Sequence, residues 1–144
     1  MFISNHVLAG TAVGRLSRRP TTAFVAGVVS HLAMDMVLHW GDERGWDEFV
    51  RVARVDGTIG LGLSVAVLAT TSGRDRWPVA LGITGACLID MDKPGQHFFG
   101  RSPFPAAVDR LHARIQWQRP VGALVEAATA AALVVGLLAI QRRG

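Results

Sequence analysis

The chain contains little cysteine and little charge. Cys87 is the single cysteine among 144 residues, which excludes an internal disulfide and a cysteine-rich zinc site. Only 18% of the residues are charged, whereas 50% are hydrophobic, and the mean hydropathy of +0.32 is high for a soluble protein. This balance favours a small all-α, multi-pass membrane protein of one domain, residues 1–144, over a soluble helical bundle.

The sequence also lacks features of two other classes. The first 16 residues have neither the basic start nor the cleavage site of a secretory signal peptide, so we expect them to belong to the folded domain. No basic helix or aromatic platform for nucleic acid is visible, so we expect no nucleic-acid partner. The arginines instead form short clusters at the ends of apolar runs, a pattern typical of membrane orientation: Arg15, Arg18 and Arg19; Arg74 and Arg76; Arg142 and Arg143.

The apolar runs predict four to five membrane helices. We expect these helices over about residues 3–16, 21–40, 57–71, 77–90 and 121–140, with an interfacial helix over 49–55 and a surface helix over 104–117. The first, third and fourth runs are shorter than the ~20 residues of an unaided span. Gly10 and Gly14 have the spacing that permits close helix contact in lipid. Pro94 and Gly95 are expected to end the fourth helix.

The arginine clusters also predict an orientation. If they are cytoplasmic, then all five histidines, together with Asp90 and Asp92, fall at the opposite membrane face. The connection over residues 90–120 carries basic residues as well, so the sequence leaves open which face holds them.

The sequence from Ser30 to Trp40 places His31, Asp35 and His39 at four-residue steps within an apolar segment. On a helix, residues four apart lie on one stripe. Imidazole and carboxylate groups are the usual ligands of zinc and related divalent metals, and ionisable groups are costly in apolar surroundings. We therefore predict a metal site here. The alternative is that both histidines are interior side chains bonded to backbone.

Four further residues at the same predicted face extend the site. His6, Asp90 and His112 are candidate ligands, and the mixture of imidazole and carboxylate favours zinc, with manganese or magnesium as alternatives. Asp90 and Asp92 point in different directions on a regular helix, so both reach one site only if the helix ends or unwinds there. An Asp92 that does not bind metal is a candidate general base.

Other charged residues are candidates for catalysis and substrate binding. Glu126 is the one acid in the last apolar run, and an acid in a membrane span is a candidate site residue, here a second candidate base. Arg101, Arg110 and Arg114 could bind a phosphate or an anionic lipid head group, although ordinary solvated arginines are equally consistent.

Three segments carry a family resemblance. His-Val-Leu-Ala-Gly at 6–10, Ser-His-Leu-Ala-Met-Asp at 30–35 with His-Trp at 39–40, and Leu-Ile-Asp-Met-Asp-Lys-Pro at 88–94 resemble the YdjM-like family of membrane-bound metal-dependent hydrolases. The resemblance covers about the first hundred residues. Ile89 and Lys93 depart from the family pattern, which often has proline and histidine there. The resemblance implies a hydrolase of the bacterial inner membrane.

Three functions fit these observations. The first is a metal-dependent hydrolase that cleaves a phosphoester or another ester in a membrane lipid or lipid-linked substrate. The second is a non-catalytic protein that binds or moves a metal. The third is a structural protein whose histidines only stabilise helix packing. The oligomeric state is left open.

Overall fold

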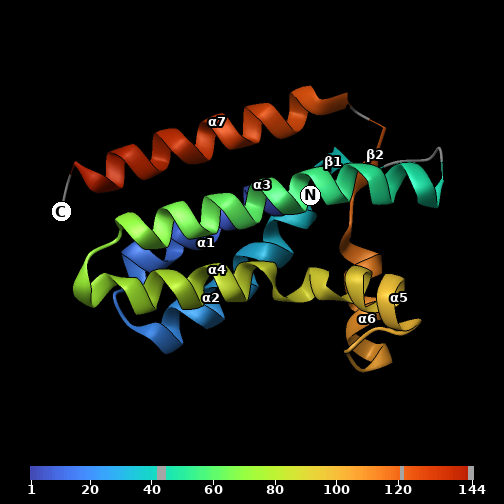
Figure 1. Ribbon diagram of the computed structural model, residues 1–144, viewed down its shortest axis with the longest axis horizontal. Helices are drawn as coiled ribbons and strands as arrows, with labels where there is room; N and C mark the ends of the chain where they lie inside the picture. The colour runs from blue at the N-terminus through green and yellow to red at the C-terminus, as the bar shows by residue number, and fades with distance from the viewer. Residues whose placement is uncertain (42–44, 121, 143–144) are drawn as a thin grey trace.

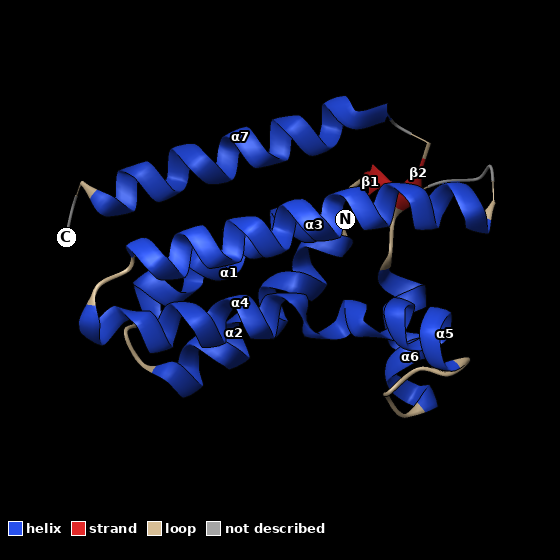
Figure 2. Cartoon of the chain, viewed as in Figure 1, coloured by secondary structure: helices blue, strands red, loops and turns tan. Residues whose placement is uncertain are grey.

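The computed structural model describes residues 1–41, 45–120 and 122–142, and within them the fold is helical apart from two very short strands (Figure 2). This confirms the all-α prediction. The helices are α1 (Ile3–Ser17), α2 (Pro20–Asp35), α3 (Trp46–Thr70), α4 (Arg76–Leu88), α5 (Asp92–Phe99), α6 (Ala106–Ile115) and α7 (Gly122–Gln141); the strands are β1 (His39–Trp40) and β2 (Gln118–Arg119).

The centre of the fold is a close packing of α1 and α2 against α4. Figure 1 shows α1, α2, α3, α4 and α7 running lengthwise through the molecule, with α5 and α6 gathered at one end. A Cβ atom at Gly10 would lie 2.6 Å from the carbonyl oxygen of Gly82, and one at Gly14 would lie 2.5 Å from Val79 Cα. Such an approach excludes any side chain at these two positions. The predicted close helix contact at Gly10 and Gly14 is confirmed.

Two outer helices are long and apolar enough to cross a membrane. They are α3 and the Leu124–Gln141 part of α7, and only 11% and 6% of their most apolar windows are buried inside the protein. Their remaining surface is apolar and uncovered, as expected of helices that face lipid. The helices α1, α2 and α4 are shorter, with 15, 16 and 13 residues, so the count of four to five spans stays a prediction.

The chain passes back and forth between two ends of the bundle. At one end, the turns after α1 and before α4 and the last residues of α7 line a common hollow that includes Arg15, Arg18 and Arg74. We call this the arginine end, and it confirms that the basic turns gather together; Arg143 lies outside the described residues. At the other end, His6, His31 and His112 contact one another, and we call this the histidine end.

The prediction of one helix over residues 21–40 is wrong at its C-terminal end. The helix α2 ends at Asp35, and β1 follows and pairs in parallel with β2. The Trp117 N–H donates to the Asp35 carbonyl, and the His39 N–H donates to the Trp117 carbonyl. Because these bonds draw the chain into a strand, His39 does not continue the helical stripe of His31 and Asp35.

The predicted separation of helices 49–55 and 57–71 is also wrong, because α3 is continuous through Asp56 and Gly57. The Asp56 carboxylate accepts hydrogen bonds from the backbone N–H groups of Ile3 and Ser4 in α1. The Asp56 side chain therefore accepts hydrogen bonds at the start of α1 and does not mark the start of a separate helix.

Pro94 and Gly95 do not end a helix either, because both lie inside α5. Proline is accepted in the first turn of a helix, where the N–H groups have no partner within the helix. The predicted break instead comes before them, where a 3₁₀ turn over Ile89–Met91 separates α4 from α5.

Candidate metal centre

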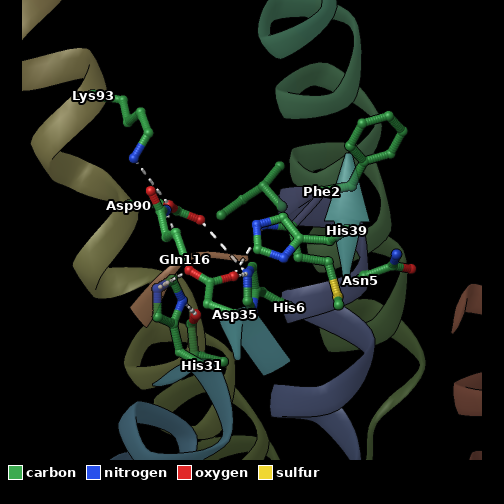
Figure 3. A network of polar contacts seen from close by, with 12 residues as sticks. Phe2, Asn5, His6, His31, Asp35, His39, Asp90, Lys93 and Gln116 are labelled. Carbon is green, nitrogen blue, oxygen red and sulfur yellow. Dashed lines mark hydrogen bonds and ion pairs between the residues drawn. The ribbon is translucent and has the colours of Figure 1, made fainter. Parts of the chain in front are cut away.

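Four of the predicted ligands converge at the histidine end. His31 and Asp35 come from α2, Asp90 comes from the 3₁₀ turn after α4, and His112 comes from α6. One ligand atom from each residue lies within 4.8 Å of the corresponding atoms of the other three. We call these four residues the metal centre. Figure 3 shows Asp35 at the middle of the group, with His31 and Asp90 around it.

The ligand atoms face one another. The Asp35 Oδ2 atom lies 3.3 Å from His31 Nε2 and 3.0 Å from His112 Nε2, and the two Nε2 atoms are 3.3 Å apart. The His112 Nε2 atom lies 3.7 Å from Asp90 Oδ1. The side chains of His31 and Asp35 are fully buried, and that of Asp90 is 17% exposed. The centre is therefore sealed except on the side of Asp90.

The other nitrogen of each imidazole is held by an acceptor. His31 Nδ1 lies 2.7 Å from the Ala86 carbonyl oxygen, and His112 Nδ1 lies 2.9 Å from Asp92 Oδ2. A carbonyl oxygen can only accept, so His31 carries its proton on Nδ1, and in the neutral ring the Nε2 lone pair points at the metal centre. Metal-binding histidines are usually oriented by an outer partner of this kind. The pattern therefore fits a metal site better than it fits incidental histidine packing.

The helix is interrupted at Asp90 by the 3₁₀ turn over Ile89–Met91, which meets the condition for Asp90 and Asp92 to reach one site. This turn directs Asp90 to the metal centre and Asp92 to the far side of the His112 ring. Burial raises the pKa of Asp92, but the hydrogen bond from His112 and the charge of Lys93 outweigh it and lower that pKa below its ordinary value. Asp92 is therefore an ionised acceptor that orients His112.

The pKa of His112 is shifted in the opposite direction, upward. Burial lowers the pKa of its imidazole, but the hydrogen bonds to Asp35 and Asp92 outweigh burial and raise that pKa to about 9. In the metal-free protein, His112 is thus protonated at neutral pH. A metal that binds its Nε2 atom must displace that proton.

The two other predicted ligands, His6 and His39, are also buried at this end. His6 Nε2 lies 3.3 Å from Asp35 Oδ1 and 3.7 Å from Asp90 Oδ2, and the His6 ring stacks on His31 with centroids 4.2 Å apart. The Met1 ammonium lies 3.0 Å from the same Asp35 oxygen. His39 bonds the Val37 carbonyl through Nδ1. Among the described residues, neither ring nitrogen of His6 has a hydrogen-bond partner, nor does Nε2 of His39.

Glu126, a predicted base, is buried but lies outside the metal centre. Its carboxylate accepts hydrogen bonds from the Phe2 N–H, the Trp40 N–H and the Asn5 amide, at 3.2, 3.0 and 2.7 Å. Figure 3 places Phe2 and Asn5 on the side of the site away from Lys93. Glu126 therefore ties the start of α1 to β1.

Sequence reasoning missed Asp56, which has the same structural role as Glu126. The first turn of α1 contains no acidic residue, and the helix has no side-chain cap of its own. The Asp56 carboxylate, on α3, is the acceptor that α1 lacks. It accepts hydrogen bonds from the Ile3 backbone N–H and from the Ser4 hydroxyl. The signal that could have pointed to it is its position as an acid directly before the apolar run of residues 57–71.

A cleft of about 880 Å³ adjoins the metal centre, and Asp90 lines it. We call it the apolar cleft, because its walls are mostly apolar. Lys93 and Gln116 also line it, and both were missed by sequence reasoning. Lys93 Nζ lies 3.9 Å from Asp90 Oδ1, and Gln116 Nε2 lies 3.3 Å from Asp35 Oδ2. The signal for Gln116 was its position four residues after His112.

The three predicted substrate-binding arginines lie apart from this opening. Arg101, Arg110 and Arg114 are exposed, and none of them is among the described residues that line the apolar cleft. Their assignment to a phosphate or a lipid head group stays a prediction.

No family model matches this chain, and no curated protein or solved structure matches it. The resemblance to the YdjM-like family therefore stays an expectation. What the geometry supports directly is a helical protein with a buried group of histidine and aspartate that could hold a metal ion.

Proposed function

We propose that the protein is a membrane-bound hydrolase that uses a divalent metal, zinc by preference, to cleave a phosphoester or ester in a lipid-linked substrate. The observation that carries the proposal is the orientation of His31 and His112. Each directs Nε2 at the buried Asp35 carboxylate, beside the partly exposed Asp90, while its Nδ1 atom is held by Ala86 or Asp92. Two histidines with two carboxylates form a nitrogen and oxygen donor set that suits zinc or manganese.

The residues of the chain have distinct tasks in this proposal. A bound metal would lower the pKa of a water molecule and polarise the scissile group. His31, Asp35, Asp90 and His112 hold the ion, and Asp92 orients His112. Hydrolysis adds the oxygen of water to phosphorus or to the carbonyl carbon. The bond to the leaving oxygen then breaks, and that oxygen takes up a proton.

His6 has one of two tasks. Its ring is buried at the metal centre, where Nε2 faces the carboxylates of Asp35 and Asp90, and Nδ1 has no hydrogen-bond partner among the described residues. Such a ring is free to bind the ion as a further ligand or to accept the proton of the attacking water. Asp92 and Glu126, predicted as bases, both have their carboxylates occupied by other groups. His6 therefore becomes the favoured base.

The interior next to the site does not support metal transport. A transport path would continue the polar groups toward the arginine end. Beyond His6, Val7, Val79 and Ile83 instead form an apolar cluster between α1 and α4. The buried Thr11 hydroxyl donates to the Val7 carbonyl of its own helix. The metal centre is therefore one-sided, and it opens toward the apolar cleft.

Aromatic side chains support a position in the membrane. Trp77 is 70% exposed at the start of α4, at the arginine end, and Trp46 and Trp117 are about half exposed at the histidine end. Tryptophan is enriched at both surfaces of a bilayer. This distribution supports a bundle that crosses the membrane with its two ends at opposite surfaces.

The test is metal content together with hydrolysis. We expect detergent-purified protein to hold zinc or manganese near one equivalent by elemental analysis, and to hydrolyse bis(p-nitrophenyl) phosphate or p-nitrophenyl acetate. His6→Ala distinguishes the two tasks of His6: loss of metal assigns it as a ligand, and retained metal with loss of hydrolysis assigns it as the base. Metal-free protein that is also not stabilised by added zinc or manganese would contradict the proposal.

A further inference from the structure

The apolar cleft has the size and composition of a ligand site. Its volume of about 880 Å³ falls in the range of small-molecule pockets. One wall is the N-terminal half of α3, and the others come from the start of α1, β1 and α5. Large aromatic side chains line it: Phe2, Trp40, Trp46, Phe49 and Phe98. An occupant of this cleft must be largely apolar.

Two polar side chains of the cleft lie where it meets the metal centre. Lys93 reaches from α5 toward Asp90, and Gln116 lies beside Asp35, as Figure 3 shows. The lysine ammonium is a point charge that suits phosphate oxygens. Arg54 also lines the cleft, from α3, but Lys93 is the one that lies beside a metal ligand. An occupant with one anionic group at the metal centre would therefore place that group at Lys93.

The far wall of the cleft continues into a surface suited to lipid. Leu61 lines the cleft and is 68% exposed. Val65, one turn further along α3, is also exposed. The helix α3 is one of the two that are long and apolar enough to cross a membrane. A hydrocarbon chain could thus pass from the bilayer along the apolar C-terminal half of α3 and enter the cleft at Leu61.

We propose that the apolar cleft binds the hydrocarbon chain of a phosphate-bearing lipid and holds its phosphate between Lys93 and the metal centre. This inference rests on the proposed function, because it names the substrate class of that site. It adds a physical basis for selectivity: the chain is recognised by the aromatic walls, and the head group is recognised by its charge.

The experiment uses tryptophans as reporters. Of the four tryptophans in the chain, Trp40 and Trp46 line the cleft, whereas Trp77 and Trp117 do not. The full-length W77F/W117F variant in dodecyl maltoside is titrated with a lysophosphatidate whose acyl chain carries bromine, which quenches indole fluorescence on contact. We expect saturable quenching that unbrominated lysophosphatidate reverses.

Two glycines of α3 provide a matched pair of variants. A Cβ atom at Gly57 or at Gly62 would meet nothing within 4 Å, but only Gly57 lines the cleft. In the reporter background, G57F should raise the half-quenching lipid concentration at least tenfold, and G62F should leave it unchanged. If G57F does not fold, A53F replaces it, because Ala53 is exposed and lines the same wall.

Lys93→Gln tests the head group. It should weaken quenching by brominated lysophosphatidate about tenfold, as expected when a charge-assisted contact is lost. Quenching by a brominated monoacylglycerol, which has no charge, should stay as it is. An equal effect on both lipids would overturn the assignment of the phosphate to Lys93.

The outcomes separate this inference from the proposed function. Hydrolysis of bis(p-nitrophenyl) phosphate without saturable quenching, or quenching that G57F and A53F do not weaken, would overturn the cleft assignment and leave the hydrolase proposal standing. Saturable quenching that G57F weakens, without hydrolysis of soluble or lipid substrates, would support the cleft and overturn the hydrolase proposal.

Discussion

Two regions of buried acid lie close together at the histidine end, and they differ in their partners. In the metal centre, Asp35 faces the Nε2 atoms of His31 and His112. At the start of α1, Asp56 and Glu126 instead accept hydrogen bonds from backbone N–H groups. We call this second region the cap region.

The comparison teaches that burial alone does not identify a metal ligand. A buried acid is costly unless it is paired, and both regions solve that problem. In the cap region the donors are backbone N–H groups together with the Ser4 hydroxyl and the Asn5 amide, so those carboxylates are already satisfied and stabilise the fold. In the metal centre the partners are imidazole nitrogens whose protons a metal can replace. The first arrangement supports structure and the second can support chemistry.

The strongest test of this difference is His31→Ala. Loss of a direct ligand should lower metal affinity more than the roughly 10- to 100-fold that the loss of an outer hydrogen bond costs. Affinity is measured by competition with a chromophoric chelator. The control is His97→Ala, because His97 is an exposed histidine at the same end and should be dispensable for metal binding. Equal metal loss in both variants would contradict the assignment.

A smaller effect is expected for Asp92→Ala. This change removes the acceptor at His112 Nδ1 and leaves the four ligands in place. Metal affinity should fall about 10- to 100-fold while the bound stoichiometry at saturating metal is kept. A complete loss of stoichiometric binding at saturating metal would mean that Asp92 is itself a ligand.

A substitution in the cap region should lower the stability of the fold and leave metal binding unchanged. Asp56→Ala leaves the first N–H groups of α1 without their acceptor, so the free energy of unfolding should fall by about 1–3 kcal/mol. Metal stoichiometry should not change. The measurement is thermal unfolding in detergent beside elemental analysis, with Asp47→Ala at the exposed start of α3 as the control. Loss of metal from a folded Asp56→Ala protein would contradict the purely structural role assigned to the cap region.

The smallest effect is expected when the pH is changed. His112 has a pKa of about 9 in the metal-free protein, raised above the ordinary value of 6.5. The stabilisation from its protonated form is fully present below about pH 6.5 and is lost as the pH rises through about 9. Because metal must displace this proton, metal affinity should rise about tenfold per pH unit up to about pH 9 and then level off. A pH-independent affinity between pH 7 and 9 would contradict the role of His112.

The sequence predicted those parts of the site that depend on local geometry. His31 and Asp35 are four residues apart on one helix, so helical periodicity alone brings them together. Asp90 and Asp92 were identified as the acids at the end of the fourth apolar run. The break in the helix lies at the 3₁₀ turn over Ile89–Met91 and not at Pro94 and Gly95, which lie inside α5. The arginine clusters likewise predicted that the basic turns share one end of the bundle.

The rest depended on contacts between distant segments. His39 left the helical stripe because its strand pairs with Gln118 far along the chain. Asp56 could not be assigned, since its partners belong to α1, some fifty residues earlier. Lys93 looked like a departure from a family pattern until the cleft placed it next to Asp90. Sequence patterns do not show which helices pack against one another, so they do not predict such pairings.

The unequal lengths of the packed helices bear on the bilayer itself. At a rise of 1.5 Å per residue, α1, α2 and α4 are about 20 to 24 Å long, whereas a hydrocarbon core is about 30 Å thick. If the five long-axis helices cross together, the mismatch is relieved by local thinning of the membrane, at a fraction of a kcal/mol per Å. Thinning would bring lipid head groups down to the level of Asp90 and Lys93. The short glycine-packed core would then deform the membrane so that its lipids reach the metal centre.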